Sequence, residues 1–261
     1  NTQYVTSMEE MFYMCSELKS LNLLSFNTEN VESMKSMFCS CINLESLNLE
    51  NFDTSSVVDM EDMFASCQKL KVLNVKNFDT SFVAQMRGMF SSVTSITSLD
   101  LSSFGTPSVE DMSNMFSDCE SLEYLDISKF DFTKLTNMEK MFYKCSSLTS
   151  LNLANFKTNS VKRMDSLFQG CSKLKSLDLS HLITNEVTTM ANMFSGCSSL
   201  EKLDCSSFKT EKVFSMSNMF NGCSLLTSLD VSSFDITNVE STNNMFELCT
   251  SLTSLNLKNF I

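Results

Sequence analysis

The cysteines are the most evident candidates for a chemical role in this sequence, because nine of the eleven recur at a single 26-residue interval. Thiolates can form disulfides or bind zinc, and each role needs a particular arrangement in space. Residues that recur at one interval predict a row of side chains, one in each turn of a repeated structure. Val93 fills the only interrupted place. The row consists of Cys15, Cys41, Cys67, Cys119, Cys145, Cys171, Cys197, Cys223 and Cys249.

A row of thiols suits packing better than either reactive role. Neighbouring cysteines would fall at the short end of the disulfide range, but a disulfide would pull against regular stacking. Zinc needs three or four thiolates that converge on one point, whereas a row diverges along a line. Val93 fits packing and cannot bind a metal. We therefore expect buried, apolar thiols, with Cys205 also buried and Cys39 the most exposed. The row itself favours neither an extracellular nor an intracellular location.

A second row recurs at the same 26-residue interval and consists of asparagine and aspartate alone. Its neighbours are apolar and should point inward, so this row should point outward. Two interpretations remain open. The shared acceptor oxygens could bond nearby hydroxyls or the next strand, which we favour because both residue types fill the row. Alternatively the row could bind a polar or cationic partner, or calcium, with Asp178, Asp204 and Asp230 as weak candidates. The row is Asn22, Asn48, Asn74, Asp100, Asp126, Asn152, Asp178, Asp204, Asp230 and Asn256.

The remaining composition excludes several classes of function. The 31 acidic and 19 basic residues give a net charge of −12, which disfavours nucleic acids and anionic membrane surfaces as partners. The only histidine, His181, leaves little for acid–base catalysis or for a zinc site with several imidazoles. The sequence has no run of roughly 18 apolar residues that could span a bilayer. We therefore expect no enzymatic activity, no cofactor, no resident metal and no insertion of this segment into a membrane.

Both rows belong to one 26-residue repeat, which occurs ten times without insertion or deletion. Counting Met11 as position 1, the unit reads Met-Phe-x-x-Cys-x-x-Leu-x-x-Leu-[Asn/Asp]-Leu-x-x-Phe-x-Thr-x-x-Val-x-x-Met-x-x. The cysteine row therefore occupies position 5, and the Asn/Asp row occupies position 12. Met-Phe begins every unit except one, which begins with Leu167-Phe168. The other units begin at Met11, Met37, Met63, Met89, Met115, Met141, Met193, Met219 and Met245.

The pattern within each unit predicts a short strand and a short helix. The strand is expected around positions 10 to 13, where apolar residues alternate with the period of two that a strand shows. From position 19 to position 3 of the next unit, apolar residues at helical spacing predict a helix of about three turns. Threonine at position 18 suits the helix N-cap, and Pro107 falls at the first helical position. Gly170, Gly196 and Gly222, at position 4, would follow the helix end.

Such units must stack, because one strand and one short helix cannot bury their apolar faces alone. We expect an α/β fold: a right-handed leucine-rich-repeat solenoid with a concave parallel sheet of ten strands and helices on the convex side. Positions 8, 11, 13 and 16 should point inward from the sheet, and positions 21, 24, 2 and 5 from the helices. The methionine and phenylalanine columns then form the core. Residues 1–261 would form a single array, which we expect to be a fragment of a longer protein.

The repeat resembles one subclass of leucine-rich repeats. Met-Phe-Ala-Ser-Cys-Gln-Lys-Leu-Lys-Val-Leu at residues 63–73, with Asn-Phe-Asp-Thr-Ser at 77–81, is similar to the BspA-like leucine-rich-repeat surface proteins. These include the repeat arrays of mycoplasma surface lipoproteins. The likeness covers the whole chain and implies a virulence-associated, non-catalytic array for adhesion or host recognition. It also implies a cell-surface location, with a lipid or wall anchor in a region outside this chain.

Specificity in such an array should reside where the outward positions differ between units. We expect the concave face to bind an extracellular protein or glycan of the host or its matrix, with Tyr124 as the aromatic anchor. Two alternatives remain open: an intracellular protein-interaction scaffold, whose thiols would suit a reducing compartment, and a structural spacer stiffened by calcium. The candidate binding residues are Asp100, Tyr124, Asp126, Asp178, Lys202, Asp204 and Asp230.

Overall fold

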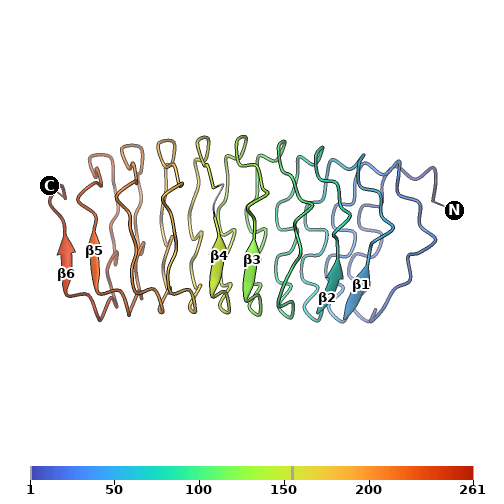
Figure 1. Cartoon of the computed structure of the whole chain (residues 1–261), viewed down its shortest axis with the longest axis horizontal. Coiled ribbons are helices and arrows are strands. Elements are labelled where there is room, and N and C mark those ends of the chain that lie inside the picture. Colours follow the sequence, from blue (N-terminus) through green and yellow to red (C-terminus); the bar gives the residue numbers. More distant parts are fainter. Residues whose placement is uncertain (1, 154–155, 261) are drawn as a thin grey trace.

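The chain winds into a row of stacked coils, with one coil for each 26-residue unit (Figure 1). This computed structural model describes residues 2–153 and 156–260. The two ends of the chain lie at opposite ends of the row, so each inner coil packs between its neighbours in the sequence. The expected repeat solenoid is confirmed. That the array is a single domain stays a prediction.

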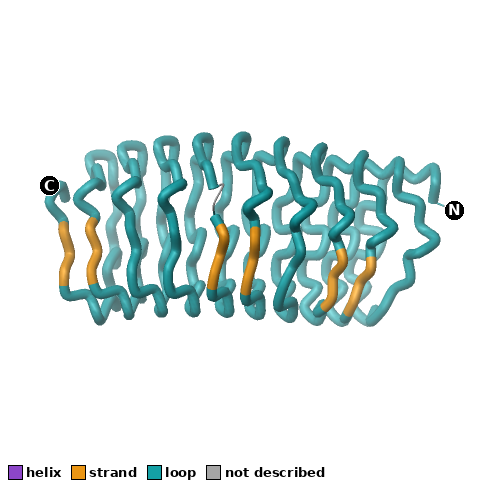
Figure 2. The backbone as a smooth tube through the Cα atoms, viewed as in Figure 1, coloured by secondary structure: helices purple, strands orange, loops and turns teal. Residues whose placement is uncertain are grey.

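In the described residues, six strands of three residues each lie on one side of the row, at positions 10 to 12 of their units. They pair in parallel as three two-stranded sheets, β1–β2, β3–β4 and β5–β6, in a register that joins equivalent residues (Figure 2). The predicted strand position is confirmed, but a continuous ten-strand sheet is wrong for the described residues. Each strand is short because a turn begins at position 12. The strands are β1 (Ser46–Asn48), β2 (Val72–Asn74), β3 (Tyr124–Asp126), β4 (Ser150–Asn152), β5 (Ser228–Asp230) and β6 (Ser254–Asn256).

A second ladder runs along the opposite side of the coils, which we call the ladder face. Residues at position 23 form parallel bridges with their equivalents in the next coil, without interruption from Ser7 to Ser241. In Figure 1 this side is the fainter backbone behind the strands. The inter-coil ladder is therefore more continuous here than on the side that carries the strands.

The predicted helices are wrong: the described part of the chain contains no helix, and the α/β class is not confirmed. Each coil makes a series of tight turns instead. The residues at positions 26 and 4 have positive φ in every coil, for example Asp62 at 53° and Ser66 at 60°. A right-handed helix needs consecutive residues at negative φ, so the left-handed residue at position 26 interrupts the predicted helix, whereas the one at position 4 lies just beyond its expected end.

The backbone of this segment bonds to the next coil. The N–H of Phe38 donates to the carbonyl of Met63 at 2.9 Å, and the N–H of Ser40 donates to that of Ala65 at 2.7 Å. The intervening amides close turns within their own coil. Apolar side chains spaced by three and four residues reach the core from these turns just as they would from a helix, and this is why the sequence suggested one.

The glycines at position 4 do not end helices, so that prediction is wrong, but they do adopt the left-handed conformation. Gly170 has a φ of 78°. The equivalent residues Lys144 and Leu248 adopt 54° and 58°, so the coil imposes this conformation whatever the residue. Glycine adopts it without the steric cost that a side chain adds.

The core consists of columns that run the length of the row. In one inner coil Met63, Phe64 and Cys67 are fully buried. The position-2 rings of adjacent coils stack, as Phe38 does on Phe64 with centroids 5.8 Å apart and planes 2° apart. Parallel rings at this separation are offset, which is a favoured arrangement of aromatic pairs. The predicted methionine and phenylalanine core is confirmed.

Threonine at position 18 links adjacent coils, so the N-cap prediction is wrong. The buried Thr54 hydroxyl donates to the carbonyl of Asp79 at 2.9 Å and accepts the N–H of the same residue at 2.8 Å. One side chain thereby satisfies both backbone groups of a residue in the next coil. The same pair of bonds is made by Thr2, Thr28, Thr106, Thr158, Thr184 and Thr210.

Replacing Thr54 with valine should lower the free energy of unfolding by about 1 to 3 kcal/mol, because both backbone groups of Asp79 lose a buried partner. Urea denaturation followed by circular dichroism measures this loss. Thr6→Val, at an exposed threonine, is the control and should change the free energy by less than about 0.5 kcal/mol. Equal stability of Thr54→Val and the unaltered chain would show that the hydroxyl does not hold the coils together.

Candidate binding face

The cysteine column is a row of hydrogen-bond donors that is buried in the inner coils. The thiol of Cys67 donates to the carbonyl of Phe38 in the preceding coil, with an Sγ–O distance of 3.1 Å. All eleven cysteines are free. Val93 packs at the same place without a thiol to donate. The equivalent bond is made by Cys41, Cys119, Cys145, Cys171, Cys197, Cys223 and Cys249.

Burial keeps these thiols protonated. It raises the pKa of Cys41 to about 11 and the pKa of Cys119 to about 12. Because the thiolate is the form that binds zinc or attacks a disulfide, the buried thiols of the column are unreactive at neutral pH. The expected packing role is confirmed, and Cys205 is buried as predicted. The most exposed thiol is Cys15 rather than Cys39, which is half-buried, because the outermost coil is covered on one side only.

Alkylation should distinguish the exposed thiol from the column. At about pH 8, iodoacetamide should modify Cys15 first, while Cys119 and Cys145 stay unmodified until urea unfolds the chain, because burial raises their pKa. Peptide mass spectrometry after a time course measures the modified fraction at each site. Modification of Cys145 in the folded chain as fast as that of Cys15 would contradict a sealed thiol column.

We define the strand face as the surface formed by the side chains of positions 10, 12 and 14. In β1, Ser46 and Asn48 are exposed, whereas Leu47 between them is buried. The same alternation in β3 exposes Tyr124 and Asp126. The predicted outward direction of the Asn/Asp row is therefore confirmed.

Residues of the Asn/Asp row bond to their own backbone two residues further on. Asp126 Oδ1 accepts the N–H of Ser128 at 2.9 Å, and Asn48 Oδ1 accepts the N–H of Glu50 at 3.1 Å. This bond closes the turn that ends the strand, and it needs an acceptor oxygen but no charge. The geometry therefore supports the structural interpretation of the row. The same bond is made by Asn22, Asn74, Asp100, Asp178, Asp204, Asp230 and Asn256.

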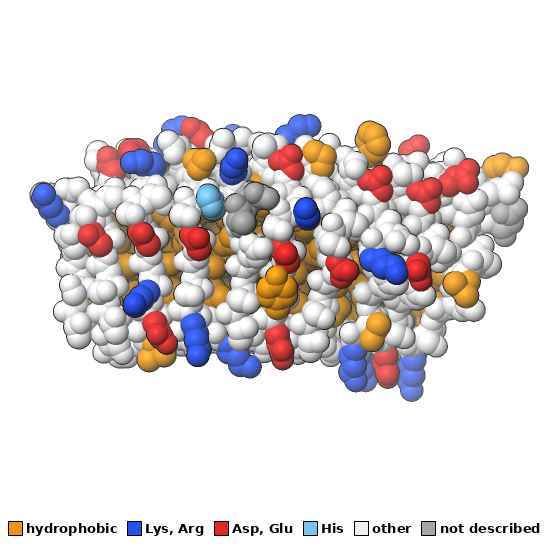
Figure 3. All heavy atoms as spheres, in the orientation of Figure 1, with side chains coloured by type: hydrophobic (Ala, Val, Ile, Leu, Met, Phe, Trp, Pro, Cys, Tyr) orange, Lys and Arg blue, Asp and Glu red, His pale blue; other side chains and the backbone are white. Residues whose placement is uncertain are grey.

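The turn also favours the ionised form of the aspartates. The hydroxyl and N–H of Ser102 lower the pKa of Asp100, and the N–H and hydroxyl of Ser128 lower the pKa of Asp126. Negative charge is therefore fixed along the strand face, and Figure 3 shows acidic side chains spaced across it. Serine at position 14 lowers the pKa in the same way at Asp178, Asp204 and Asp230.

Within residues 2–153 and 156–260, no three His, Cys, Asp or Glu side chains are arranged to hold a metal ion. The calcium candidates Asp178, Asp204 and Asp230 occupy equivalent places in three consecutive coils and so follow a line. Calcium takes six to eight oxygen ligands around one centre. Calcium binding stays a prediction that this geometry does not support.

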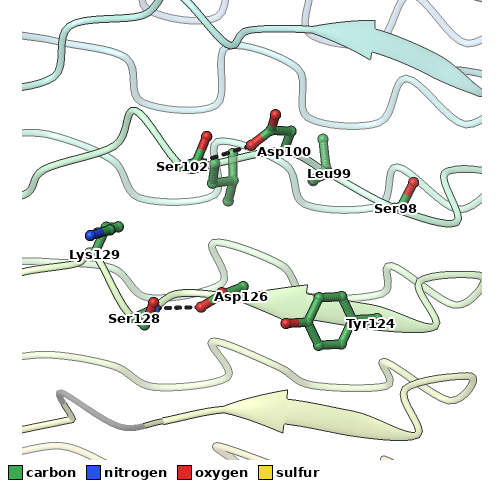
Figure 4. Close-up of a pocket in the computed structure, with 9 residues that line it drawn as sticks. Ser98, Leu99, Asp100, Ser102, Tyr124, Asp126, Ser128 and Lys129 are labelled. Atoms are coloured by element: carbon green, nitrogen blue, oxygen red, sulfur yellow. Dashed lines mark hydrogen bonds between the residues drawn. The ribbon is translucent and has the colours of Figure 1, made fainter.

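A hollow of about 330 Å³ lies on the strand face beside Tyr124 (Figure 4). Leu99 and Leu101, whose side chains point toward the core, give it an apolar floor. Asp100 and Asp126 line it from two adjacent coils. The hollow thus combines one aromatic ring, an apolar floor and two carboxylates. Its remaining lining residues are Ser98, Ser102, Ser128 and Lys129.

A second hollow, of about 270 Å³, shares Tyr124 and lies toward the following coils. Leu151 and Asn152 line it from β4, and Asp178 and His181 line it from the coil beyond. The tyrosine side chain therefore stands between two hollows instead of packing into a continuous surface.

The structure brings together four of the seven predicted binding residues around these two hollows: Asp100, Tyr124, Asp126 and Asp178. Asp204 joins Asp178 in a smaller hollow of about 150 Å³. The predicted residues that lie further along the strand face, outside all three hollows, are Lys202 and Asp230.

Sequence reasoning missed Lys129 and the leucine floor. Lys129 is the only lysine at position 15, where other coils have serine, asparagine or histidine, and this departure was an available signal. Leu99 belongs to a core column, yet it is 9 % exposed. No sequence pattern indicates that exposure, because it depends on how closely adjacent coils approach each other.

The chain belongs to the family described as "Mycoplasma protein of unknown function, DUF285". The family model matches residues 1–73, 68–180 and 164–260. These three overlapping matches together cover nearly the whole chain. The expected relationship to mycoplasma repeat arrays is therefore confirmed at the level of the family.

Solved structures that resemble the chain include bacterial leucine-rich-repeat proteins. A leucine-rich-repeat protein from T. pallidum is 19 % identical, with 65 % of this chain and 72 % of that chain covered and a TM-score of 0.40. A leucine-rich cell surface protein from Faecalibacterium prausnitzii is 17 % identical, with 95 % and 68 % covered and a TM-score of 0.36. A leucine-rich-repeat protein from Bacteroides ovatus is 21 % identical, with 97 % and 70 % covered and a TM-score of 0.27.

No curated protein matches the sequence. The identities and TM-scores of the solved structures are too low to carry an argument about binding. The described residues also contain no apolar helix of the length that a membrane crossing requires.

Two substitutions at one aspartate separate the acceptor role from charge. Asp204→Asn should lower the melting temperature at neutral pH only slightly, because asparagine offers an oxygen to the N–H of Ser206 but lacks the charge that strengthens the bond. Asp204→Ala should lower it, because the turn loses its acceptor. Differential scanning calorimetry compares the two variants, and an equal loss in both would show that the negative charge is what matters.

Acid should weaken the fold through the same residues. Their pKa values are lower in the folded chain, so their stabilisation is complete above the unfolded value of about 3.9 and is lost as the pH falls through the folded value. Melting temperatures measured from about pH 6 to pH 2 should therefore fall, and Asp204→Asn should reduce the fall. A melting temperature that is independent of pH across this range would contradict the bonding of the ionised row.

Proposed function

We propose that this chain is a non-enzymatic binding and adhesion module of a bacterial cell-surface protein, and that its strand face recognises a host or matrix protein or a glycan. The observation that carries the proposal is the pair of hollows on either side of the exposed Tyr124. Ligand sites are typically concave and partly apolar, with a few placed polar groups. The strand face combines these properties at Tyr124.

The residues that point into the core vary little between coils, whereas those at an outward-pointing position vary more, and this contrast supports the proposal. The core columns are nearly uniform, whereas at position 10 serine is replaced by Val72, Tyr124 and Lys202. Repeat arrays present such variable residues on an extended, rigid surface. Tyrosine is enriched among the residues that contribute most of the binding energy in protein interfaces. These features favour recognition through side chains that differ between coils.

The ionisation of the described groups supports binding rather than catalysis. General acids and bases work best with a pKa near the operating pH, but the pKa values of Asp100 and Asp126 are lowered. The buried thiols, such as Cys119, have raised pKa values and are poor nucleophiles at neutral pH. We propose no cofactor for this module.

The motif resemblance to the BspA-like surface proteins supports a location on the cell surface, and we propose a lipid or wall anchor outside this chain. The net charge of −12 makes nucleic acid an unsuitable partner. An intracellular scaffold is the second candidate, and the exposed free thiol of Cys15 favours it, because a reducing compartment preserves a thiol that burial does not protect. Labelling of intact cells by an antibody against the folded chain would support the surface location.

Capture from a defined panel tests the binding function. Beads that carry the folded chain should retain at least one component from a set of purified matrix proteins, host surface glycoproteins and glycans. Tyr124→Ser should weaken that binding by about tenfold or more, because a central aromatic contact contributes strongly. Surface plasmon resonance measures the change. The variant should fold, since serine stands at this position in both adjacent coils, at Ser98 and Ser150.

The control is Lys162→Thr, an exposed substitution beside the position-23 ladder at a place where other coils have threonine. It should leave the affinity unchanged, because it lies far from the strand face. If Lys162→Thr weakened binding as much as Tyr124→Ser, or if the unaltered chain retained nothing from the panel, the proposed function would be wrong.

A further inference from the structure

The tyrosine that separates the two hollows has space on both of its sides. Tyr124 pairs with Ser150 in β4 and forms a bridge with Ser98 in the preceding coil. Both neighbours have small side chains, so neither covers the aromatic ring, and the residue is 49 % exposed. The ring therefore offers its faces to a ligand instead of to the protein.

The hollow beside this ring suits a planar, partly apolar group. Leu99 and Leu101 line its floor, and the ring of Tyr124, which Figure 4 shows nearly face-on over β3, borders it on one side. A group that enters this space contacts hydrocarbon below and can lie against the aromatic ring. Planar cations favour such a place, because a guanidinium group both stacks on an aromatic ring and is attracted by its electrons.

The charge of the hollow selects for a cation. Asp100 and Asp126 occupy equivalent places in adjacent coils, one stacking step apart, and both line the hollow. Their Oδ1 atoms accept the backbone N–H groups of Ser102 and Ser128, which fixes both carboxylates in place. Two like charges held opposite one another are unfavourable until a positive group lies between them.

Lys129 is the cation among the residues that line this hollow, and its charge helps to lower the pKa of Asp126. Figure 4 places Lys129 at the end of the hollow away from Tyr124, beyond Ser128. Two aspartates and one lysine leave the lining with one net negative charge. The whole chain carries −12, so its field also attracts a basic partner.

We propose that the hollow between Tyr124 and the carboxylates of Asp100 and Asp126 binds an arginine side chain from an extended, basic segment of the protein partner. The inference rests on the proposed function and narrows it from a protein or glycan to a protein. The guanidinium group stacks on the tyrosine ring and donates hydrogen bonds to the carboxylates. A sugar could also stack on the ring and donate hydroxyl hydrogen bonds to the carboxylates, but it brings no positive charge to neutralise them.

A pair of matched peptides tests this site. The probe is a fluorescein-labelled nonapeptide of glycine and serine with three arginines, and its partner carries citrulline in place of each arginine. Citrulline keeps the shape of arginine and removes its charge. In fluorescence anisotropy at low salt, the arginine peptide should bind the whole chain at least tenfold more tightly than the citrulline peptide.

Variants taken from the chain's own repeat locate the binding. Asp126→Asn keeps an acceptor for the N–H of Ser128, because Asn48 makes the same bond in its coil. This variant and Tyr124→Ser should each weaken the arginine peptide by about fivefold. Asp230→Asn is the matched control: it makes the same change of charge in the same row, outside the hollow, and should change the affinity less than twofold.

Several outcomes would overturn the inference without affecting the proposed function. One is an equal loss in Asp230→Asn and Asp126→Asn, which would mean diffuse attraction to the acidic row. Another is equal binding of the arginine and citrulline peptides. A third is a glycan from the panel whose capture depends on Tyr124 while the arginine peptide does not bind. If the beads capture no component of the panel, the proposed function is wrong. That result comes from the capture experiment and is independent of the peptide measurements.

Discussion

Backbone hydrogen bonding between adjacent coils is the interaction on which the rest of this structure depends. The amides at positions 24, 26, 2 and 4 donate to carbonyls of the next coil, as Phe38 does to Met63. Because buried backbone N–H and C=O groups must find hydrogen-bond partners, an inner coil needs its neighbours to supply them. Equivalent residues must therefore meet, which explains why all ten units keep one length without insertion or deletion.

The polar columns extend the same constraint into the side chains. The hydroxyl of Thr54 satisfies both backbone groups of Asp79 in the next coil, and the thiol of Cys67 bonds to Phe38 in the preceding one. The Asn/Asp row does the equivalent within its own coil by closing the turn after the strand. Residue types that are familiar from active sites are here held by the requirements of stacking. Burial raises the pKa of the buried thiols, and hydrogen bonding lowers the pKa of the aspartates in the row. Neither group therefore has a pKa that is useful in catalysis.

Function is left to the side chains that stacking does not constrain. Position 10 tolerates serine, valine, tyrosine and lysine because its side chain points away from the core. A large residue between two small ones leaves space beside it, and Tyr124 between Ser98 and Ser150 does so. A single departure from the repeat can thus create a site without any change in the backbone. The columns around it keep that site rigid, which limits the entropy lost when a ligand binds.

The sequence alone determined the 26-residue period, the buried columns, the position of the strands and the outward direction of the Asn/Asp row, because these follow from the alternation of apolar residues. It also indicated Tyr124 as the aromatic residue on that face. Only the tertiary structure decided that tight turns replace the helices, since residues spaced by three and four face the core from either. It also decided the partners of Thr54 and Cys67 and the hollows beside Tyr124. These features depend on how adjacent coils pack against each other. The residues that meet are about one repeat apart in the sequence, so no local pattern specifies the contact.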